Sequence, residues 1–420
     1  MTPQEDLSVN QALAAVLAGV TVLPPENVPL LEALGRVLAA PVVARDSLPP
    51  FANSSMDGYA VRAADVASAA VQPVTLRVAA DVAAGAISPV VITPGLAARI
   101  TTGAPMPDGA DAVVPVEDTN EAWRDRERPL PATIQINRAV QTGDYVRGVG
   151  EDVQAGQIVI PAGQVVRPQE IGLLASLGFS EVMVVKRPYV AILATGDELI
   201  AIDQPLTPGK IRNSNGYTQA SQVAALGAQP LMLGVAGDSE AEVRACLQVG
   251  LEAGVDLFVS SAGVSVGAYD VVKAVLEQEG QVGFWRVRMR PGKPLAYGTY
   301  RGVPYLGLPG NPVSALVSFE RFARAAILKM AGHTKFERPM VTAVLQDEIR
   351  SDGRESYIRA IVTHAPDGAY TATTTGSQGS HMMTSLVKAN ALLIVPEGLT
   401  FVGRGDQLNA WMLDWPDFVF

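Results

Sequence analysis

The sequence contains very few of the residues that bind soft metals. Its 420 residues include a single cysteine, Cys246, and three histidines, His333, His364 and His381. One cysteine excludes an internal disulfide and is typical of a reducing compartment. A zinc site built from cysteine and histidine is implausible for the same reason. We therefore expect any metal to be a hard ion held by carboxylates, or to arrive as an oxyanion held by hydrogen-bond donors.

Long apolar runs and excess positive charge are also missing. No apolar run approaches the roughly 20 residues that span a bilayer, and residues 1–6 are polar and acidic, unlike a signal peptide. We expect a cytoplasmic protein with no membrane partner. The formal net charge of -10 argues against a nucleic-acid partner, because binding a phosphate backbone requires a basic face.

What the chain does have is ample apolar sequence, with 48% hydrophobic and 18% charged residues, which is enough to form cores. Strands and helices are expected to alternate from residue 189 to about 330. Strands are predicted at 189–194 and 257–261, and helices at 217–226, from 239 to about 254, and at 270–278. Such alternation predicts a mostly parallel sheet covered on both faces, with ligands bound at the carboxyl ends of its strands.

The flanking segments follow other patterns. Residues 9–38 are expected to be mainly helical, and residues 53–148 form short strands with frequent proline and glycine, typical of a small β domain. The charged run at 120–131 is expected to be a solvated hairpin tip. After residue 332 short strands return, for example at 357–362 and 391–395, which predicts a second β domain at the end of the chain.

A buried strand runs into the sequence LPGNP at 308–312 and then into a helix. Asn311 suits the cap of that helix and Pro312 its first turn. The first N–H groups and the helix dipole then favour an anion such as phosphate beyond the strand. A tight turn without a ligand is the alternative.

Two further loops carry polar groups suited to an anionic ligand. The run SSAGVSVG at 260–267 offers hydroxyl donors and small residues that let a ligand approach the backbone. Arg290 and Lys293 lie in the turn RPGK at 290–293, where they can bind phosphate. A plain glycine turn and a solvated basic turn are the respective alternatives.

Acids lie at three expected strand ends, Glu198, Asp238 and Asp270. If they converge, they can hold Mg²⁺ against a phosphate, although each alone is more simply a surface acid. Near the end of the chain, Arg359 and the turn GSQGSH at 376–381 form a plausible oxyanion pocket. We interpret His381 as an ordinary hydrogen-bonded residue.

Several runs occur in a specific order: MDGYAV at 56–61, TTGAP at 101–105, GEDV at 150–153, ATGDEL at 194–199, SVGAYD at 265–270, MRPGKP at 289–294, GLPGNP at 307–312 and GSH at 379–381. This set resembles the molybdopterin molybdenumtransferase family, which includes the C-terminal domain of gephyrin. A glycine-rich turn alone is a weak signal, whereas ordered motifs across nearly the whole chain are specific.

The resemblance implies a multidomain α/β plus β fold. A mixed helical domain would comprise residues 1–46 and 147–187, with a small β domain inserted at 47–146. A mostly parallel α/β domain of the molybdopterin-binding type would cover 188–331, and a β-barrel-like domain 332–420. The resemblance also implies a homodimer whose cleft joins domains of both subunits, and other proteins of molybdenum cofactor biosynthesis are plausible partners.

The activity implied is that of a transferase, which inserts molybdenum from molybdate into adenylylated molybdopterin, releases AMP and forms molybdenum cofactor. Mg²⁺ is the implied cofactor, with Glu198, Asp238 and Asp270 as its ligands. The catalytic residues implied are these three acids together with Asp57, Thr102 and Asp152. The ligand-binding residues predicted from the loops and the resemblance are Ser261, Gly263, Ser265, Arg290, Lys293, Pro309, Gly310, Asn311, Pro312, Arg359 and Ser380.

Two positions depart from the family pattern. Ala262 replaces a usual glycine and Ala268 a usual acid, so loop stiffness and metal affinity could differ. Two other functions stay open: adenylyl transfer to molybdopterin, which a related single α/β domain performs, and a non-catalytic scaffold that binds the pterin. A nicotinamide dehydrogenase is disfavoured, since no strand runs into a GxGxxG turn.

Overall fold

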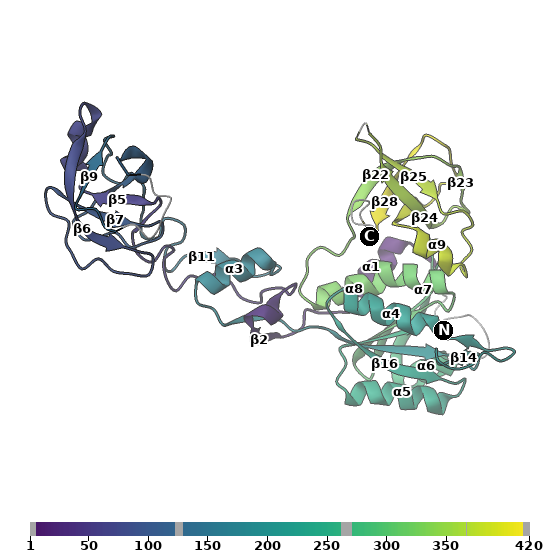
Figure 1. The fold of residues 1–420 in the computed structure, drawn as a ribbon. Helices are drawn as coiled ribbons and strands as arrows, with labels where there is room; N and C mark the ends of the chain where they lie inside the picture. The colour runs from purple at the N-terminus through teal and green to yellow at the C-terminus, as the bar shows by residue number, and fades with distance from the viewer. Residues whose placement is uncertain (1–5, 122–128, 262–270, 367, 415–420) are drawn as a thin grey trace. The chain divides into compact units, whose positions relative to one another are not determined.

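The computed structural model describes residues 6–121, 129–261, 271–366 and 368–414. The chain forms two compact units (Figure 1). Unit 1 comprises residues 1–28, 35–39 and 183–420, and unit 2 comprises 29–34 and 40–182. The chain passes between them near β2 (Pro25–Pro29) and β12 (Glu181–Val185). No helix in the described part of the chain combines the length and apolar character needed to cross a membrane.

Unit 1 contains a seven-stranded sheet. Its order is β1 (Asp6–Leu7), β18 (Gly280–Val287), β20 (Pro294–Tyr300), β21 (Val303–Leu308), β17 (Leu257–Ser261), β13 (Tyr189–Thr195) and β16 (Gln229–Ala236). The strands β16, β13, β17 and β21 are parallel, and only the pairings of β20 with β18 and β21 are antiparallel. The predicted mostly parallel sheet is confirmed.

Side chains alternate along each strand, so apolar residues point to both faces of this sheet, and helices cover both faces. Val190 and Ile192 of β13 face one core, and Ala191 and Leu193 face the other. The first core is closed by α1 (Val9–Ala18), α4 (Ser214–Ala225), α7 (Pro312–Ser318) and α8 (Arg324–Met330). The second is closed by α5 (Glu240–Glu252) and α6 (Val271–Glu279). Figure 1 shows α4 and α5 on opposite sides of β16.

A closed five-stranded barrel completes unit 1. Its strands pair in the cycle β24 (Glu355–His364), β25 (Tyr370–Thr374), β22 (Met340–Leu345), β28 (Gln407–Met412) and β26 (Ala391–Val395), which pairs again with β24. The predicted C-terminal barrel is therefore confirmed. The short strand β19 (Met289–Arg290) pairs with β24, so the barrel is joined directly to the loop after β18. The smaller elements are α9 (Met383–Lys388) and two strand pairs, β23 (Ile349–Arg350) with β27 (Phe401–Val402) and β14 (Leu199–Ile200) with β15 (Ile211–Arg212).

Unit 2 is built on the expected small β sheet. Its order is β8 (Ala112–Pro115), β5 (Gly58–Val61), β7 (Leu96–Ile100), β6 (Val74–Val82) and β9 (Thr133–Ile136), with α2 (Ala63–Val66) following β5. Beside it are the pairs β4 (Asn53–Ser54) with β10 (Val146–Arg147) and β3 (Val42–Val43) with β11 (Ile158–Ile160), and the helix α3 (Pro168–Ser176). Short 3-10 turns lie at Leu30–Ala33, Ala67–Ala70 and Val116–Asp118.

Two helix predictions need correction. The expected helical region 9–38 is helical over α1 alone before the chain turns to β2, because Gly19 ends the helix and the prolines at 24 and 25 prevent its continuation. The helix expected at 217–226 begins at Ser214, because Asn213 caps it. The predicted strands at 189–194, 357–362 and 391–395 are confirmed, and Ser239 caps α5 by accepting the N–H of Glu242. The four domain boundaries stay a prediction, and part of the charged run, 122–128, lies outside the described residues.

Candidate functional site

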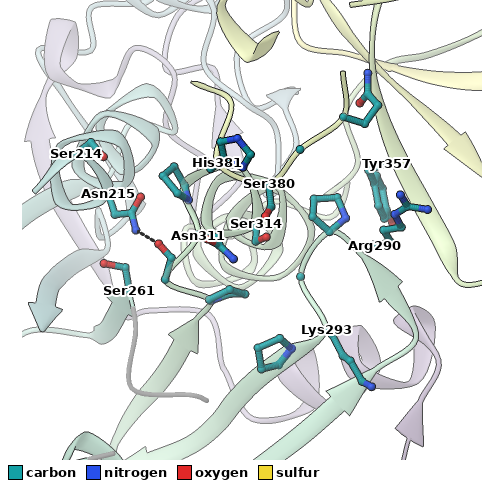
Figure 2. A pocket seen from close by; sticks show the side chains of 18 of the residues that line it. Ser214, Asn215, Ser261, Arg290, Lys293, Asn311, Ser314, Tyr357, Ser380 and His381 are labelled. Atoms are coloured by element: carbon teal, nitrogen blue, oxygen red, sulfur yellow. Dashed lines mark hydrogen bonds between the residues drawn. The ribbon is translucent and has the colours of Figure 1, made fainter. Parts of the chain in front are cut away.

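A cavity of about 960 Å³ lies in unit 1, and residues of both the α/β sheet and the barrel line it (Figure 2). The sheet contributes Thr195, Ser261 and Pro309, which end or directly follow β13, β17 and β21. The barrel contributes Arg359 and Ser380. As expected for a parallel sheet, the cavity opens at the carboxyl ends of neighbouring strands.

Basic residues outnumber acidic ones among the described residues that line this cavity, although the chain as a whole is acidic. Among the described residues that line it, five carry a positive side chain and one an acidic one: Arg212, Arg290, Lys293, Arg354 and Arg359 against Glu198. The local excess of positive charge favours an anionic ligand.

The corner at 308–312 forms one wall of the cavity. Pro312 starts α7, and its helical path continues through a π-helical turn, Phe319–Ala323, into α8. Asn311 occupies the predicted cap position, but its side chain makes no capping bond. Val313 donates its N–H to the carbonyl oxygen of Ser380 at 3.0 Å, so the barrel turn is held against the start of the helix. Figure 2 shows Ser380 beside Ser314 and Asn311.

A second helix begins at the same cavity. Asn213 caps α4 by accepting the N–H of Gly216 at 2.9 Å. Asn215 then donates from Nδ2 to the carbonyl oxygen of Gly310 at 2.7 Å, which Figure 2 shows as a dashed line. The starts of α4 and α7 are therefore tied together, and their positive dipole ends lie at one site. The sequence signal for the start of α4 was the run NSNG at 213–216, which places a capping residue three positions before a glycine.

Arg359 carries a buried charge without an acidic partner among the described residues. It belongs to β24, and its side chain is buried, with 1% of the residue exposed. Its guanidinium donates to Oε1 of Gln378 at 3.1 Å and to the carbonyl oxygens of Gly379 and Ser377 at 3.1 and 3.3 Å. Burial lowers its pKa. Because these acceptors are neutral, an anion in the cavity is the natural counter-charge.

The turn that carries Arg290 and Lys293 packs directly on the α7 helix. Gly292 has φ +109°, and a Cβ there would lie 2.4 Å from Oγ of Ser318. Glycine is therefore required for both the backbone angle and the space. Arg290 is partly buried and Lys293 is exposed, and both line the cavity. Their prediction as ligand-binding residues is consistent with this place and stays a prediction.

The three predicted metal ligands are not all described. Glu198 lines the cavity, Asp238 is exposed and does not line it, and Asp270 lies outside the described residues. Within the described ranges no group of three or more histidine, cysteine or acidic residues is arranged to hold a metal. Asp197 accepts the N–H of Asp238 at 2.9 Å, which holds the β16 end beside the β13 end. The predicted Mg²⁺ site therefore stays a prediction.

The other predicted residues fall into two groups. Asp57, Thr102 and Asp152 belong to unit 2 and are exposed, and Asp57 accepts the backbone N–H of Thr102 at 2.7 Å. Gly263 and Ser265 lie outside the described residues.

Besides Asn215, sequence reasoning did not single out Arg354 or Tyr357 of the cavity, and it named Gln378 only as part of the turn at 376–381. Arg354 donates to the carbonyl oxygen of Met289 at 3.1 Å and to the carboxylate of Asp352. The hydrogen bond from Arg354 lowers the pKa of Asp352. Tyr357 lines the wall, and burial raises its pKa. Gln378 contacts Arg359. His381, expected to be an ordinary residue, also lines the cavity. A position in the barrel strand or its turn was the only signal for these residues.

Comparisons with known proteins identify the family. Molybdopterin molybdenumtransferase 2 of Mycobacterium tuberculosis is 41% identical over 398 residues, which cover 93% of this chain and 95% of that protein. Molybdopterin molybdenumtransferase of Nostoc sp. is 41% identical, covering 91% of this chain and 87% of that protein. The chain belongs to the molybdopterin molybdenumtransferase family. The resemblance seen in the sequence motifs is thus confirmed.

Family models and solved structures agree with this assignment to the molybdopterin molybdenumtransferase family. Residues 7–178 match the MoeA N-terminal region (domain I and II), 191–329 a probable molybdopterin binding domain, and 342–413 the MoeA C-terminal region (domain IV). The molybdopterin biosynthesis moeA protein of Pyrococcus horikoshii OT3 superposes with a TM-score of 0.80 at 30% identity, covering 97% of this chain and 100% of that one. The predicted multidomain fold is confirmed.

Proposed function

We propose that this chain is a transferase that inserts molybdenum from molybdate into adenylylated molybdopterin, releases AMP and forms molybdenum cofactor. The names of its curated relatives support the reaction. One structural observation carries the proposal: Arg359, a buried cation with neutral partners, shares a cavity with the corner at Gly310. Two anionic reactants fit such a site side by side.

Arg359 and Ser380 form the molybdate end of the cavity. Molybdate is a tetrahedral dianion, and its oxygens must be held while the dithiolene sulfurs of the pterin replace them. A guanidinium fixed by three hydrogen bonds supplies directional donors that need no reorganisation. Ser380 adds a hydroxyl, and its backbone is fixed by Val313.

The phosphate end lies at the starts of α4 and α7. Their dipoles favour the phosphate that links the pterin to AMP, and Asn215 fixes the two helix starts relative to each other. Lys293 and Arg290 add positive charge where cleavage of that link develops negative charge. Holding both reactants in one cavity also removes the entropic cost of their encounter.

We also propose that Mg²⁺ acts at the phosphate, held by Glu198, Asp238 and Asp270. A donor set of carboxylate oxygens fits a hard cation, and the exposed side chains of Glu198 and Asp238 form no ion pair with a described residue. The ion, when bound, neutralises phosphate charge. Asp270→Asn should slow turnover and leave the thermal unfolding midpoint unchanged, and unchanged turnover would contradict this assignment.

A cytoplasmic homodimer is the proposed form of the protein, with other proteins of molybdenum cofactor biosynthesis as further partners. Asp57 and Thr102 support the dimer, because they form an exposed, hydrogen-bonded pair that matches family motifs and belongs to unit 2. We propose that this pair and Asp152 complete the cleft of a second subunit. Sedimentation of the full chain tests the dimer, and a monomer at catalytic concentrations would contradict it.

The direct test supplies the full chain with adenylylated molybdopterin, Mg²⁺ and molybdate, and measures AMP. The proposal predicts AMP release that requires molybdate. Consumption of ATP on free molybdopterin, indifferent to molybdate, would instead establish adenylyl transfer. Tight pterin binding with no turnover would establish a scaffold.

A further inference from the structure

The side-chain amide of Gln378 makes four hydrogen bonds, three of them to Arg359. Its Oε1 accepts the backbone N–H of Arg359 at 3.0 Å and the guanidinium Nε–H at 3.1 Å. Its Nε2 donates to the carbonyl oxygens of Arg359 at 3.2 Å and Gly376 at 3.1 Å. These partners determine the orientation of the amide, because reversing it would set donors against donors and oxygens against carbonyls.

The amide orients the guanidinium without neutralising it. The remaining guanidinium bonds end on the carbonyl oxygens of Gly379 and Ser377, so each acceptor that holds Arg359 within the described residues is uncharged. A guanidinium has five N–H groups. With Nε–H and one N–H of each Nη engaged, one N–H on each Nη is left for a ligand.

A glutamate in this position would have a similar length and could also accept the Nε–H. Its carboxylate would pair with the buried cation and compete with any anion in the cavity. It would also set an oxygen against the carbonyls of Arg359 and Gly376, where Nε2 donates now. The neutral amide therefore suits a site in which the ligand supplies the negative charge.

We propose that Gln378 is a positioning residue, which holds the Arg359 guanidinium toward the cavity and leaves its charge available to a tetrahedral oxyanion. This inference rests on the proposed function and adds to it the residue that prepares the oxyanion site. Gln378 acts through Arg359, so its effect is on anion affinity.

Calorimetric titration of the full chain with sulfate tests the proposal, because sulfate stays a dianion over the useful pH range. Three variants are compared with the wild type. Gln378→Met removes the amide without adding charge, and Gln378→Glu adds a carboxylate. Gln346→Glu is the matched control, since Gln346 lies in the same barrel, is partly buried and does not line the cavity.

The expected order of affinities separates positioning from charge. Wild type and Gln346→Glu bind sulfate equally at neutral pH. Gln378→Met binds about tenfold more weakly, because the fork loses its orientation. Gln378→Glu binds about a hundredfold more weakly, because the carboxylate repels and replaces the anion. Its affinity recovers toward that of Gln378→Met as the pH falls below the ordinary pKa of glutamate and the carboxylate becomes neutral.

A merely structural role predicts a different pattern. Equal weakening in Gln378→Met and Gln378→Glu at every pH, or no weakening in either, would overturn the inference. Melting curves establish that each variant is folded, and Gln378→Asn, which keeps the amide but shortens its reach, replaces Gln378→Met if the latter does not fold.

A parallel titration with molybdate separates this inference from the proposed function. One outcome is that the sulfate affinities follow the predicted order across the variants while the wild type does not bind molybdate. That result would contradict the proposed substrate and support the role of Gln378. Molybdate binding that is equally strong in all variants would support the substrate and overturn the role of Gln378.

Discussion

Arg359→Gln should abolish oxyanion binding while leaving the fold intact. The guanidinium is buried and has one N–H on each Nη beyond those bound to Gln378, Gly379 and Ser377. A hydrogen bond to a charged group contributes about 1.5–3 kcal/mol, so two such bonds contribute at least about 3 kcal/mol. Molybdate affinity should therefore fall at least about a hundredfold.

Thermal melting with and without molybdate measures this loss. A ligand that binds the native state at 100 times its Kd stabilises the wild type by about 2.7 kcal/mol, and Arg359→Gln should show no such gain. Arg359→Lys should retain part of it, because the charge remains but the fork is lost. Arg404→Gln is the matched control, with the same loss of charge at an exposed barrel position outside the cavity. An equal molybdate gain in Arg359→Gln and Arg404→Gln would refute the reasoning.

Three further substitutions test other parts of the account. Gly292→Ala should lower the unfolding free energy by about 1–3 kcal/mol and weaken phosphate binding, because the added Cβ would lie 2.4 Å from Oγ of Ser318. An unchanged melting midpoint would contradict this, because it would show that the turn adapts freely. Asn215→Ala removes the 2.7 Å hydrogen bond to Gly310 and should raise KM for the adenylylated pterin about tenfold, with little change in the molybdate affinity. Steady-state kinetics with each substrate varied in turn measure both effects. Equal effects on the two substrates would contradict the idea that they bind at separate ends of the cavity. The pKa of Glu170 is held at about 2, chiefly by hydrogen bonds from the arginine that precedes its helix. Its stabilising contribution is therefore present above its ordinary pKa of 4.5 and is lost as the pH falls toward about 2. Melting midpoints of wild type and Glu170→Gln should differ at neutral pH and converge in acid, and a constant difference would contradict this.

The strand ends of the α/β sheet could be predicted from the sequence. Each apolar run, such as 189–195, is bounded by small or polar residues, and parallel strands place their carboxyl ends at one edge. Thr195, Ser261 and Pro309 therefore line one cavity. The family motifs also located Arg359 and Ser380, which share that cavity although they belong to the barrel.

The start of α4 and the surroundings of Arg359 could not be predicted in the same way. The run at 213–216 is rich in asparagine, serine and glycine, which is equally typical of a loop, so the cap on Gly216 was overlooked. Gln378 binds Arg359 across 19 residues, a contact that depends on the register of the antiparallel pairing between β24 and β25. Residue type and local pattern contain no information about such a contact.

Helix length was overestimated at the beginning of the chain for a related reason. Apolar residues continue after Ala18 with a spacing that suits a helix, but two prolines follow at 24 and 25, and β2 begins at the second of them. The cap of α7 was also assigned to the side chain of Asn311, whereas the barrel turn engages that helix start through Ser380. A tertiary contact replaced the local signal at α7, whereas at the beginning of the chain the local proline signal was overlooked.

Diffraction from crystals soaked in molybdate tests the central claim most directly, because molybdenum scatters anomalously and its position needs no interpretation of side-chain density. The account predicts an anomalous peak that marks a molybdate ion, with the oxygens of that ion within hydrogen-bond distance of the Arg359 guanidinium and Ser380. A peak at the start of α7 alone, or at any site that leaves Arg359 without an anion, would contradict it.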